Sequence, residues 1–370
     1  MKKDHHHTHI LLLCSGLNAV GGQEKMVVSF ANSLAQEGYR ISILIVGDTT
    51  ESFYPIDGNI NVALLNADFG IGSRVNYLKR KINFIKDIVR LKKAISIISP
   101  NLIITTEYSI TTAAILGGLA ASTKAICWQH SSFTIKKSFL WDKASKYAYK
   151  KIHCIVALNA AEQKSYSFYN SHTVVIPNFI PSAKSISDLS SKTILTIARF
   201  DAVKGIDLLI PAAAIVLNQH PDWQWKLIGK GDLQKEYSSS ISKYGWHKNL
   251  IVQAPVSNEI SNEYQQAAIY VLPSRNELFP MVLLEAMSHG VPCIAFDCDT
   301  GPRHIITDNV DGILVEKENP EKLAEAISLL IRDKEKRNHM GKAAFENVKR
   351  FTSDIVLKKW EALFNSLLHS

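Results

Sequence analysis

The feature that most constrains the fold of this chain is a regular alternation of short apolar runs with longer helix-like stretches. Runs rich in Ile, Leu and Val recur through the first half at 10–13, 41–46, 102–105, 124–128 and 154–157. Stretches with apolar residues at helical spacing lie between them, such as 23–37, which is closed by Gly38. Strands that alternate with helices form a parallel sheet covered by helices, so the sequence predicts an α/β fold.

The second half of the chain repeats this pattern after a polar break. Apolar runs recur at 193–197, 225–228, 250–253, 269–272, 293–296 and 313–315, and the serine-rich stretch 182–192 separates the two series. A chain of 370 residues is long enough for two full cores. We therefore expect an N-terminal domain over 1–180, a C-terminal domain over 181–350 and a closing helix over 351–370 that could pack back on the first domain. A ligand cleft between the two domains is the default expectation.

Composition narrows the class of protein. The chain is 46% hydrophobic and 21% charged, which is typical of a globular protein. No run reaches the roughly 18 apolar residues of a membrane-spanning helix. The five cysteines include no CxxC pair, which favours a reducing compartment such as the cytoplasm over a disulfide framework or a zinc site. We assign no metal to the N-terminal histidines at 5, 6, 7 and 9.

Positive charge is concentrated in two runs of the first half. The stretch from Arg74 to Lys93 holds eight lysines and arginines against one aspartate, a net charge of +7, and Lys136 to Lys151 holds six against one, a net charge of +5. The simpler interpretation is a solvated helix surface with its other face on the core. We favour the alternative, a surface that binds anionic lipid headgroups. Nucleic acid is disfavoured as a partner, because no basic–aromatic array is present.

Two glutamates stand eight positions apart where an apolar strand gives way to a helix. Glu277 falls in the loop after the strand 269–272, and Glu285 falls about one turn into a helix for which Pro280 is a good first residue. The carboxyl end of a strand is where α/β sheets bind phosphorylated ligands. Carboxylates repel phosphate but accept hydrogen bonds from hydroxyls, such as those of a ribose or a sugar. Spacing alone would also allow a general acid and base, as in a glycosidase.

Two further loops suit an anionic ligand. Gly21 and Gly22 lie between the first strand and the first helix, where a helix N-terminus favours an anion. Arg199 and Lys204 follow the first strand of the second half, and both can reach one diphosphate. Each pair also has a simpler interpretation, a loop with special backbone angles or two solvated cations.

Three other segments carry weaker signals. Gly229 and Gly231 form a turn after a strand that could contact a nucleotide or could merely be tight. His130 follows the strand 124–128, where it could enter a cleft or pack as an ordinary histidine. Asp297 and Asp299 have the spacing of a metal-chelating pair, but Gly301-Pro302-Arg303 follows at once, so we interpret this segment as a turn.

Together these segments resemble the retaining glycosyltransferases of family 4, which have the GT-B fold of two Rossmann-like domains facing across a cleft. The second half is especially similar to bacterial transferases that build O-antigen, capsule or lipid-linked oligosaccharides. The segment from Glu277 to Glu285 is the most specific part of the resemblance. The other residues that carry it are Gly21, Gly22, Glu24, Lys25, Arg199, Lys204, Gly205, Gly229, Gly231, Gly301, Pro302, Arg303, Asp311 and Gly312.

The resemblance implies a role for each site residue. Glu285 would bind the ribose hydroxyls and Glu277 the hydroxyls of the donor sugar, while Arg199 and Lys204 would hold the diphosphate as it leaves. The sugar and phosphate pocket would be lined by Phe279, Pro280, Met281 and Val282. Gly21 and Gly22 would approach the diphosphate, and Gly229 and Gly231 would lie near the nucleotide. His130 would lie near the sugar, on the acceptor side.

The implied reaction is transfer of a hexose or N-acetylhexosamine from a nucleotide sugar, with UDP the expected nucleotide, to a lipid-linked or polysaccharide acceptor. It would proceed with retention, without a metal or a further cofactor, at the inner face of the cell membrane. Developing charge on the leaving diphosphate needs fixed cations and amide dipoles. The resemblance implies that the leaving phosphate takes the acceptor proton on the same face, so neither glutamate is assigned as a nucleophile. The alternatives are a soluble transferase that makes a small glycoside and a non-catalytic sugar-binding protein. A dinucleotide-dependent oxidoreductase is disfavoured, because Gln234 occupies the third glycine position of its fingerprint.

Overall fold

The chain folds into two compact units. The computed structural model describes residues 7–67, 69, 77–119, 123–134, 138–182, 187–243, 249–254 and 260–369, and its account of side chains in the helix Tyr77–Ile98 begins at Ile82. Unit 1 comprises Met1–Asn178 together with Asp354–Ser370, and unit 2 comprises Phe179–Ser353.

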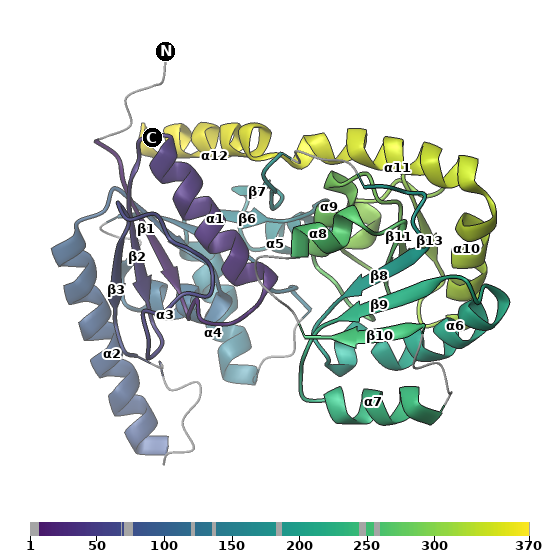
Figure 1. Ribbon diagram of the computed structural model, residues 1–370. Coiled ribbons are helices and arrows are strands. Elements are labelled where there is room, and N and C mark those ends of the chain that lie inside the picture. The colour runs from purple at the N-terminus through teal and green to yellow at the C-terminus, as the bar shows by residue number, and fades with distance from the viewer. Residues whose placement is uncertain are drawn as a thin grey trace. The chain divides into compact units, whose positions relative to one another are not determined.

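Unit 1 is built on a parallel sheet of seven strands in the order β3-β2-β1-β4-β5-β6-β7. Figure 1 shows β1, β2 and β3 of this sheet side by side. The strand order reverses between β1 and β4, so the switch point of this sheet lies at the carboxyl ends of these two strands. The elements of unit 1 are β1 (His9–Cys14), α1 (Gly22–Gln36), β2 (Arg40–Ile45), β3 (Asn61–Leu64), α2 (Tyr77–Ile98), β4 (Leu102–Thr105), α3 (Tyr108–Leu116), β5 (Lys124–Trp128), α4 (Phe139–Lys151), β6 (Cys154–Ala157), α5 (Ala160–Ser167), β7 (Thr173–Val175) and α12 (Ser353–Leu368).

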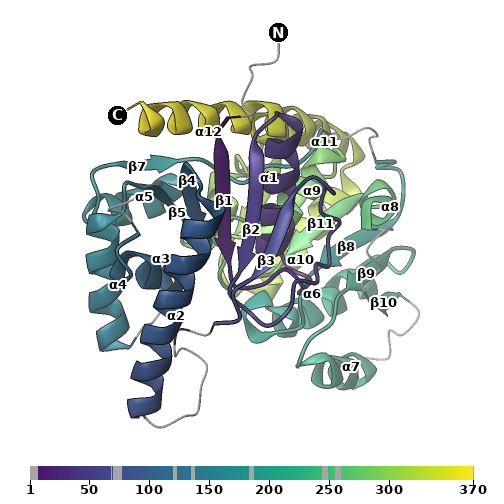
Figure 2. The same cartoon turned by 90° about the vertical axis from the view of Figure 1, so that its left-hand side faces the viewer.

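Helices cover both faces of the unit 1 sheet. Figure 2 shows α2, α3 and α4 grouped on one side, and alternate strand residues such as Leu11 and Leu13 pack with them in one buried cluster. On the other side, Phe30 of α1 meets Trp360 of α12 with ring centroids 4.7 Å apart, and Trp360 lies 5.3 Å from Trp128. The C-terminal helix therefore contributes a fully buried tryptophan to the core of unit 1.

Unit 2 has a second parallel sheet, of six strands in the order β10-β9-β8-β11-β12-β13. Its order reverses between β8 and β11, which places the switch point at their carboxyl ends. The elements of unit 2 are β8 (Thr193–Ile197), η2 (Ala202–Lys204), α6 (Ile206–Gln219), β9 (Gln224–Ile228), α7 (Gln234–Lys243), β10 (Leu250–Gln253), α8 (Ile260–Gln265), β11 (Ile269–Leu272), α9 (Met281–Ser288), β12 (Cys293–Phe296), η3 (Pro302–His304), β13 (Gly312–Val315), α10 (Pro320–Arg332), α11 (Lys334–Val348) and η4 (Lys349–Phe351).

The two Rossmann-like parallel sheets confirm the predicted fold class, with two local differences. Strand β3 was not predicted, because it is only half-buried and its flanks are polar. Helix α9 begins at Met281, and Pro280 is its N-cap instead of its first residue. Glu285 nevertheless falls one turn into the helix, as expected.

One helical stretch, Ala202–Gln219, is long and apolar enough to cross a membrane by composition, with a mean hydropathy of 1.3. It consists of η2 and α6. Leu209, Ala213 and Val216 of α6 are fully buried in the core of unit 2. Core packing therefore accounts for its apolar character.

Candidate functional site

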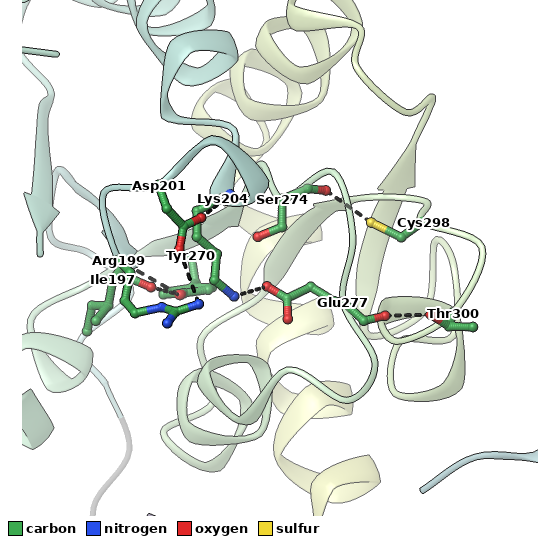
Figure 3. A network of polar contacts seen from close by, with 9 residues as sticks. All are labelled: Ile197, Arg199, Asp201, Lys204, Tyr270, Ser274, Glu277, Cys298 and Thr300. Atoms are coloured by element: carbon green, nitrogen blue, oxygen red, sulfur yellow. Dashed lines mark hydrogen bonds and ion pairs between the residues drawn. The ribbon is translucent and has the colours of Figure 1, made fainter. Parts of the chain in front are cut away.

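The predicted cations and the first glutamate come together at the switch point of the unit 2 sheet. The loop after β8 carries Arg199 and Lys204, and the loop after β11 carries Glu277. These strands pair in parallel, with Ile269 opposite Ile194, so the two loops leave the same edge of the sheet side by side (Figure 3).

Lys204 and Glu277 form a direct ion pair. The Nζ of Lys204 lies 2.6 Å from Oε1 of Glu277, and only 21% and 10% of the two side chains are exposed. Partial removal from water strengthens the attraction between the opposite charges. The structure thus brings together a cation suited to phosphate and a carboxylate suited to hydroxyls, within reach of one small ligand.

The position of Lys204 is determined by the short helix η2. Asp201 caps this helix, because its side chain accepts a hydrogen bond from the backbone N–H of Lys204 at 3.1 Å. Gly205 ends it with a left-handed backbone (φ +65°), and a Cβ at this position would lie 2.0 Å from the carbonyl oxygen of Pro273. Glycine is required there by both the angle and the space.

Arg275, which sequence reasoning missed, ties η2 to the loop after β11. Its Nη1 donates to the carbonyl of Ala202 at 2.7 Å, and its guanidinium forms a bidentate pair with Asp207 at 2.8 and 2.6 Å. Its own backbone N–H donates to Val203 at 2.8 Å. The hydrogen bond from Arg275 lowers the pKa of Asp207. Because two of its hydrogen bonds hold η2 and its pair with Asp207 holds the start of α6, Arg275 is a positioning residue for Lys204.

The backbone of Glu277 is fixed from its other side. Thr300 donates its hydroxyl to the carbonyl of Glu277 at 2.6 Å (Figure 3). Gly301 has φ +74°, and a Cβ there would lie 2.5 Å from the same carbonyl oxygen. The segment after β12 is therefore a tight turn that supports Glu277.

The aspartates of that segment have other partners. Asp297 pairs with Arg303 through two hydrogen bonds of 2.9 Å, and this bonding raises the pKa of Arg303. Asp299 is strongly exposed, with Lys317 at 3.9 Å. Among the residues that the structure describes, no group of three His, Cys, Asp or Glu side chains is placed to hold a metal ion.

Arg199 lies beside this pair without joining it. Its guanidinium is exposed and contacts Oδ2 of Asp201 at 3.1 Å. Asp201 thereby connects both predicted cations, since its side chain also caps the helix that carries Lys204. A diphosphate contact by Arg199 stays a prediction.

Glu285 is held by a tyrosine from α8. The buried Tyr264 donates its hydroxyl to Oε2 of Glu285 at 2.9 Å, and its ring stacks on His289 with centroids 5.8 Å apart. Burial, together with the nearby charge of Glu285, raises the pKa of Tyr264 well above its usual range, so the hydroxyl keeps its proton. Sequence reasoning missed Tyr264, because it precedes the motif by a strand and carries no pattern of its own.

Packing explains several of the other predicted residues in unit 2. A Cβ on Gly229 would lie 1.9 Å from the carbonyl oxygen of Ala198, and one on Gly231 would lie 2.5 Å from that of Phe200. Close approach of the loops after β8 and β9 therefore accounts for both glycines without a ligand. Their contact with a nucleotide stays a prediction.

The residues between the two glutamates are mostly buried. Phe279 and Met281 lie in the interior of unit 2, where Phe279 contacts Phe351 with centroids 5.5 Å apart. Pro280 is also buried, and Val282 is half-buried. Their predicted part in lining a sugar and phosphate pocket stays a prediction.

In unit 1, Gly21 and Gly22 stand at the start of α1. Gly21 is its N-cap, with an extended backbone (φ −151°), and neither glycine is among those with positive φ. A need for special backbone angles therefore does not explain them, and their approach to a diphosphate stays a prediction. The histidines at 5 and 6 lie outside the described residues.

His130 packs 4.3 Å from Trp128, and its Nε2 is buried without a hydrogen-bond partner among the described residues. Burial lowers the pKa of His130 to about 3. The imidazole is therefore neutral at pH 7, so it can exchange a hydrogen bond with a hydroxyl but cannot supply a positive charge.

Two family models together cover most of the chain, one over the first half and one over the second. A model described as "Glycosyltransferase Family 4" matches residues 20–184, and one described as "Glycosyl transferases group 1" matches residues 181–347. The chain is a family 4 glycosyltransferase with the GT-B fold.

Similar proteins match this glycosyltransferase over nearly its whole length. An uncharacterized glycosyltransferase of Haemophilus influenzae is 26% identical, over 94% of this chain and 97% of its own. The amylovoran biosynthesis glycosyltransferase AmsD of Erwinia amylovora is 24% identical, over 96% and 99%. Among solved structures, Anabaena HepE in complex with UDP superposes with a TM-score of 0.79 at 17% identity, over 97% and 100% of the two chains.

The arrangement in this glycosyltransferase suits a ligand that carries both an anion and hydroxyls. One half-buried cation, one exposed cation and one carboxylate lie on the loops after β8 and β11, and a second carboxylate lies one turn into α9. The cations suit the phosphate part of such a ligand, and the carboxylates suit its hydroxyl groups.

Proposed function

We propose that this glycosyltransferase moves a hexose or N-acetylhexosamine from UDP, with retention, to a lipid-linked or polysaccharide acceptor in cell-surface glycan synthesis. The observation that carries the proposal is the Lys204–Glu277 ion pair at the switch point of unit 2, with Glu285 further along the same segment, one turn into α9. A nucleotide sugar presents a diphosphate between two sets of hydroxyls, and this arrangement offers a cation and two carboxylates.

Each side chain then has a distinct task. Lys204 and Arg199 compensate the charge that develops on the departing diphosphate, which is the largest electrostatic demand of the reaction. Glu277 accepts hydrogen bonds from the sugar hydroxyls, and Glu285 accepts them from the ribose. Tyr264 fixes the rotamer of Glu285, because a hydrogen bond at 2.9 Å from a buried ring leaves the carboxylate little freedom.

Relatives support the choice of nucleotide and acceptor class. The HepE structure, which shares the fold, holds UDP, and AmsD is named for the synthesis of amylovoran. We assign charge compensation to the two cations and no metal to Asp297, because Arg303 already occupies both oxygens of that carboxylate. No nucleophile is assigned to the protein, so the departing diphosphate is the base that takes the acceptor proton.

The outer face of α2 supports a membrane-bound acceptor. Leu91 and Ile95 bury one side of this helix in the core of unit 1. On the outward side, Ile85 and Val89 are 62% and 60% exposed, next to the exposed Lys86. Apolar side chains beside cations on one helix surface suit the boundary of an anionic membrane.

Helix α4 shows the same combination. Phe139 and Leu140 are strongly exposed at its start, and Lys143 and Lys150 follow on the same helix. We therefore propose that the enzyme is cytoplasmic and peripheral, with α2 and α4 facing the inner surface of the cell membrane. Arg74, Lys136 and Lys137 of the two basic runs lie outside the described residues, as do the side chains of Lys79, Arg80 and Lys81.

The donor assignment is tested with UDP-, GDP- and ADP-sugars in a thermal-shift assay followed by measurement of UDP release. We expect stabilisation by UDP-sugars and its loss in Lys204→Ala. The matched control is Lys226→Ala, which removes a lysine of similar exposure from another unit 2 ion pair, with Glu263 at 2.8 Å. Stabilisation by none of the nucleotide sugars, or equal behaviour of the two variants, would count against the proposed site.

The membrane assignment is tested by vesicle flotation. Wild-type protein should float with vesicles of phosphatidylglycerol and phosphatidylcholine but not with phosphatidylcholine alone. Ile85→Ser should reduce flotation, whereas Val310→Ser, at a half-exposed apolar residue of unit 2, should not. Equal flotation of both variants would remove α2 from the membrane contact.

A further inference from the structure

A polar cluster at the switch point of the unit 1 sheet lies outside the set of predicted site residues. Ser15 follows β1, Glu107 follows β4, and Gln23 lies in the first turn of α1. Their side chains converge, although Ser15 and Glu107 are 92 residues apart in the chain. Ligands of doubly wound sheets bind outside the carboxyl ends of the strands at this kind of position.

Glu107 is the centre of the cluster. Its Oε1 accepts a hydrogen bond from Ser15 at 2.5 Å and another from Gln23 at 3.1 Å. Within the described ranges, no group is bonded to its second oxygen, Oε2. The side chain is half-buried, so two neighbours hold a carboxylate in place while one of its oxygens stays available to a ligand.

Helix capping does not explain this carboxylate. Glu107 occupies the N-cap position of α3, where a side-chain oxygen can accept a hydrogen bond from the helix backbone. Here the side chain makes no capping bond and reaches back to the loop after β1 instead. Its orientation is therefore one that a capping role would not produce.

An aromatic segment lies against the same β1–α1 loop. The backbone N–H of Phe53 donates to the carbonyl of Leu17 at 2.9 Å, and the hydroxyl of Tyr54 reaches the carbonyl of Gly21 at 3.4 Å. The ring of Phe53 is 39% exposed. An exposed aromatic ring and a fixed carboxylate on adjoining loops are what a sugar needs, because its C–H face packs on a ring and its hydroxyls donate to carboxylates.

We propose that Glu107 is the centre of a carbohydrate subsite on unit 1 that binds hydroxyls of the acceptor sugar. Its Oε2 accepts a hydrogen bond from a sugar hydroxyl, while Ser15 and Gln23 are positioning residues that hold Oε1. This inference rests on the proposed transferase function, because it assigns the subsite to the acceptor of that reaction.

The probes are the methyl α- and β-glycosides of glucose, galactose, N-acetylglucosamine and N-acetylgalactosamine, titrated with UDP present and followed by saturation-transfer NMR. We expect at least one glycoside to bind the wild-type protein. Glu107→Gln keeps the size and the acceptor for Ser15 but replaces Oε2 with a donor, so the Kd should rise about tenfold or more. Glu361→Gln is the matched control, since it changes a half-buried carboxylate of α12 in the same unit and should leave the Kd unchanged.

Two further variants make the outcome unambiguous. Glu107→Asp keeps the charge but withdraws the carboxylate by one methylene, so it should also raise the Kd for the glycoside. It provides the test if Glu107→Gln does not fold. Glu277→Gln removes the sugar contact of the donor site, and glycoside binding should survive it. Binding that Glu277→Gln abolishes and Glu107→Gln retains would overturn the subsite, as would a wild-type protein that binds no glycoside.

The failure of this inference differs from failure of the proposed function. If wild-type protein is not stabilised by UDP, the transferase proposal fails whatever happens at Glu107. If UDP stabilises the wild type and the Glu107 variants alike, while the glycoside Kd is the same in Glu107→Gln and Glu361→Gln, only the subsite is refuted.

Discussion

Glu277→Gln should strengthen the binding of UDP while weakening transfer. In the free protein the Glu277 carboxylate holds the Lys204 ammonium at 2.6 Å, so a diphosphate must share that cation and approach a like charge. The amide of glutamine removes both penalties. The same substitution removes an anionic acceptor for the hydroxyls of the donor sugar, so the two effects have opposite signs.

The magnitude follows from the geometry of the pair. Two unit charges at the 2.6 Å measured between Nζ and Oε1 attract by about 6 kcal/mol at an effective dielectric constant of 20. Desolvation and the remaining exposure of both side chains reduce the net contribution to about 1.5–2 kcal/mol, the lower part of the usual range for a hydrogen bond to a charged group. The Kd for UDP should therefore fall about tenfold, and kcat/KM for the UDP-sugar should fall at least about tenfold.

The assay is isothermal titration with UDP, beside initial rates of UDP release from the donor sugar. Lys204→Met is the mirror variant, and it should weaken UDP and transfer together. Folding is verified from the thermal midpoint without ligand. A Glu277→Gln protein that folds normally but binds UDP more weakly than wild type would refute the idea that the two residues compete in the free state.

Four other perturbations test separate parts of the structure. Tyr264→Phe keeps the ring contact with His289 but loses the bond to Glu285, so steady-state kinetics should show KM for the UDP-sugar raised about five- to tenfold with kcat little changed. Gly205→Ala places a Cβ 2.0 Å from the Pro273 oxygen at positive φ, so urea unfolding should show a loss of about 2–4 kcal/mol. Trp360→Ala empties a fully buried site, and urea unfolding should show unit 1 destabilised by about 3–5 kcal/mol. The pKa of His130 is lowered to about 3, so on acidification the unfolded chain protonates this imidazole near pH 6.5 and the folded chain does not. The stability that the neutral imidazole allows is therefore complete above pH 6.5 and is lost as the pH falls toward 3. In urea titrations, His130→Gln should reduce the loss of stability between pH 7 and pH 5 by about 1–2 kcal/mol.

The buried strands could be predicted closely because burial is visible in the residues themselves. The limits of β4, β8 and β11 agree with the predicted runs 102–105, 193–197 and 269–272. These strands are buried on both faces, so each reads as a continuous apolar segment. Strand β3 escaped prediction because its place depends on pairing with β2, which a half-buried stretch of four residues does not reveal.

The residues of the candidate site also differ in how far the sequence predicts them. The position of Glu277 in a loop and of Glu285 one turn into a helix follows from local sequence, and the structure agrees. Arg275, Tyr264 and Glu107 were missed because their partners lie 68, 21 and 92 residues away. Residue type is visible in the sequence, whereas the partner that gives it a role is fixed only by the fold.

The glycines of the unit 2 site suggest that its side chains are held in place before a ligand arrives. A Cβ on Gly205, Gly229 or Gly301 would lie 2.5 Å or less from a carbonyl oxygen of a neighbouring loop. The loops are therefore packed backbone to backbone, and this packing alone requires glycine at these positions. Rigid loops keep the ion pair and the tyrosine-held carboxylate in fixed geometry, so little reorganisation is needed as charge develops on a departing group. Because that benefit depends on the loops, removing any one of these glycines should reduce transfer more than it reduces the affinity for UDP.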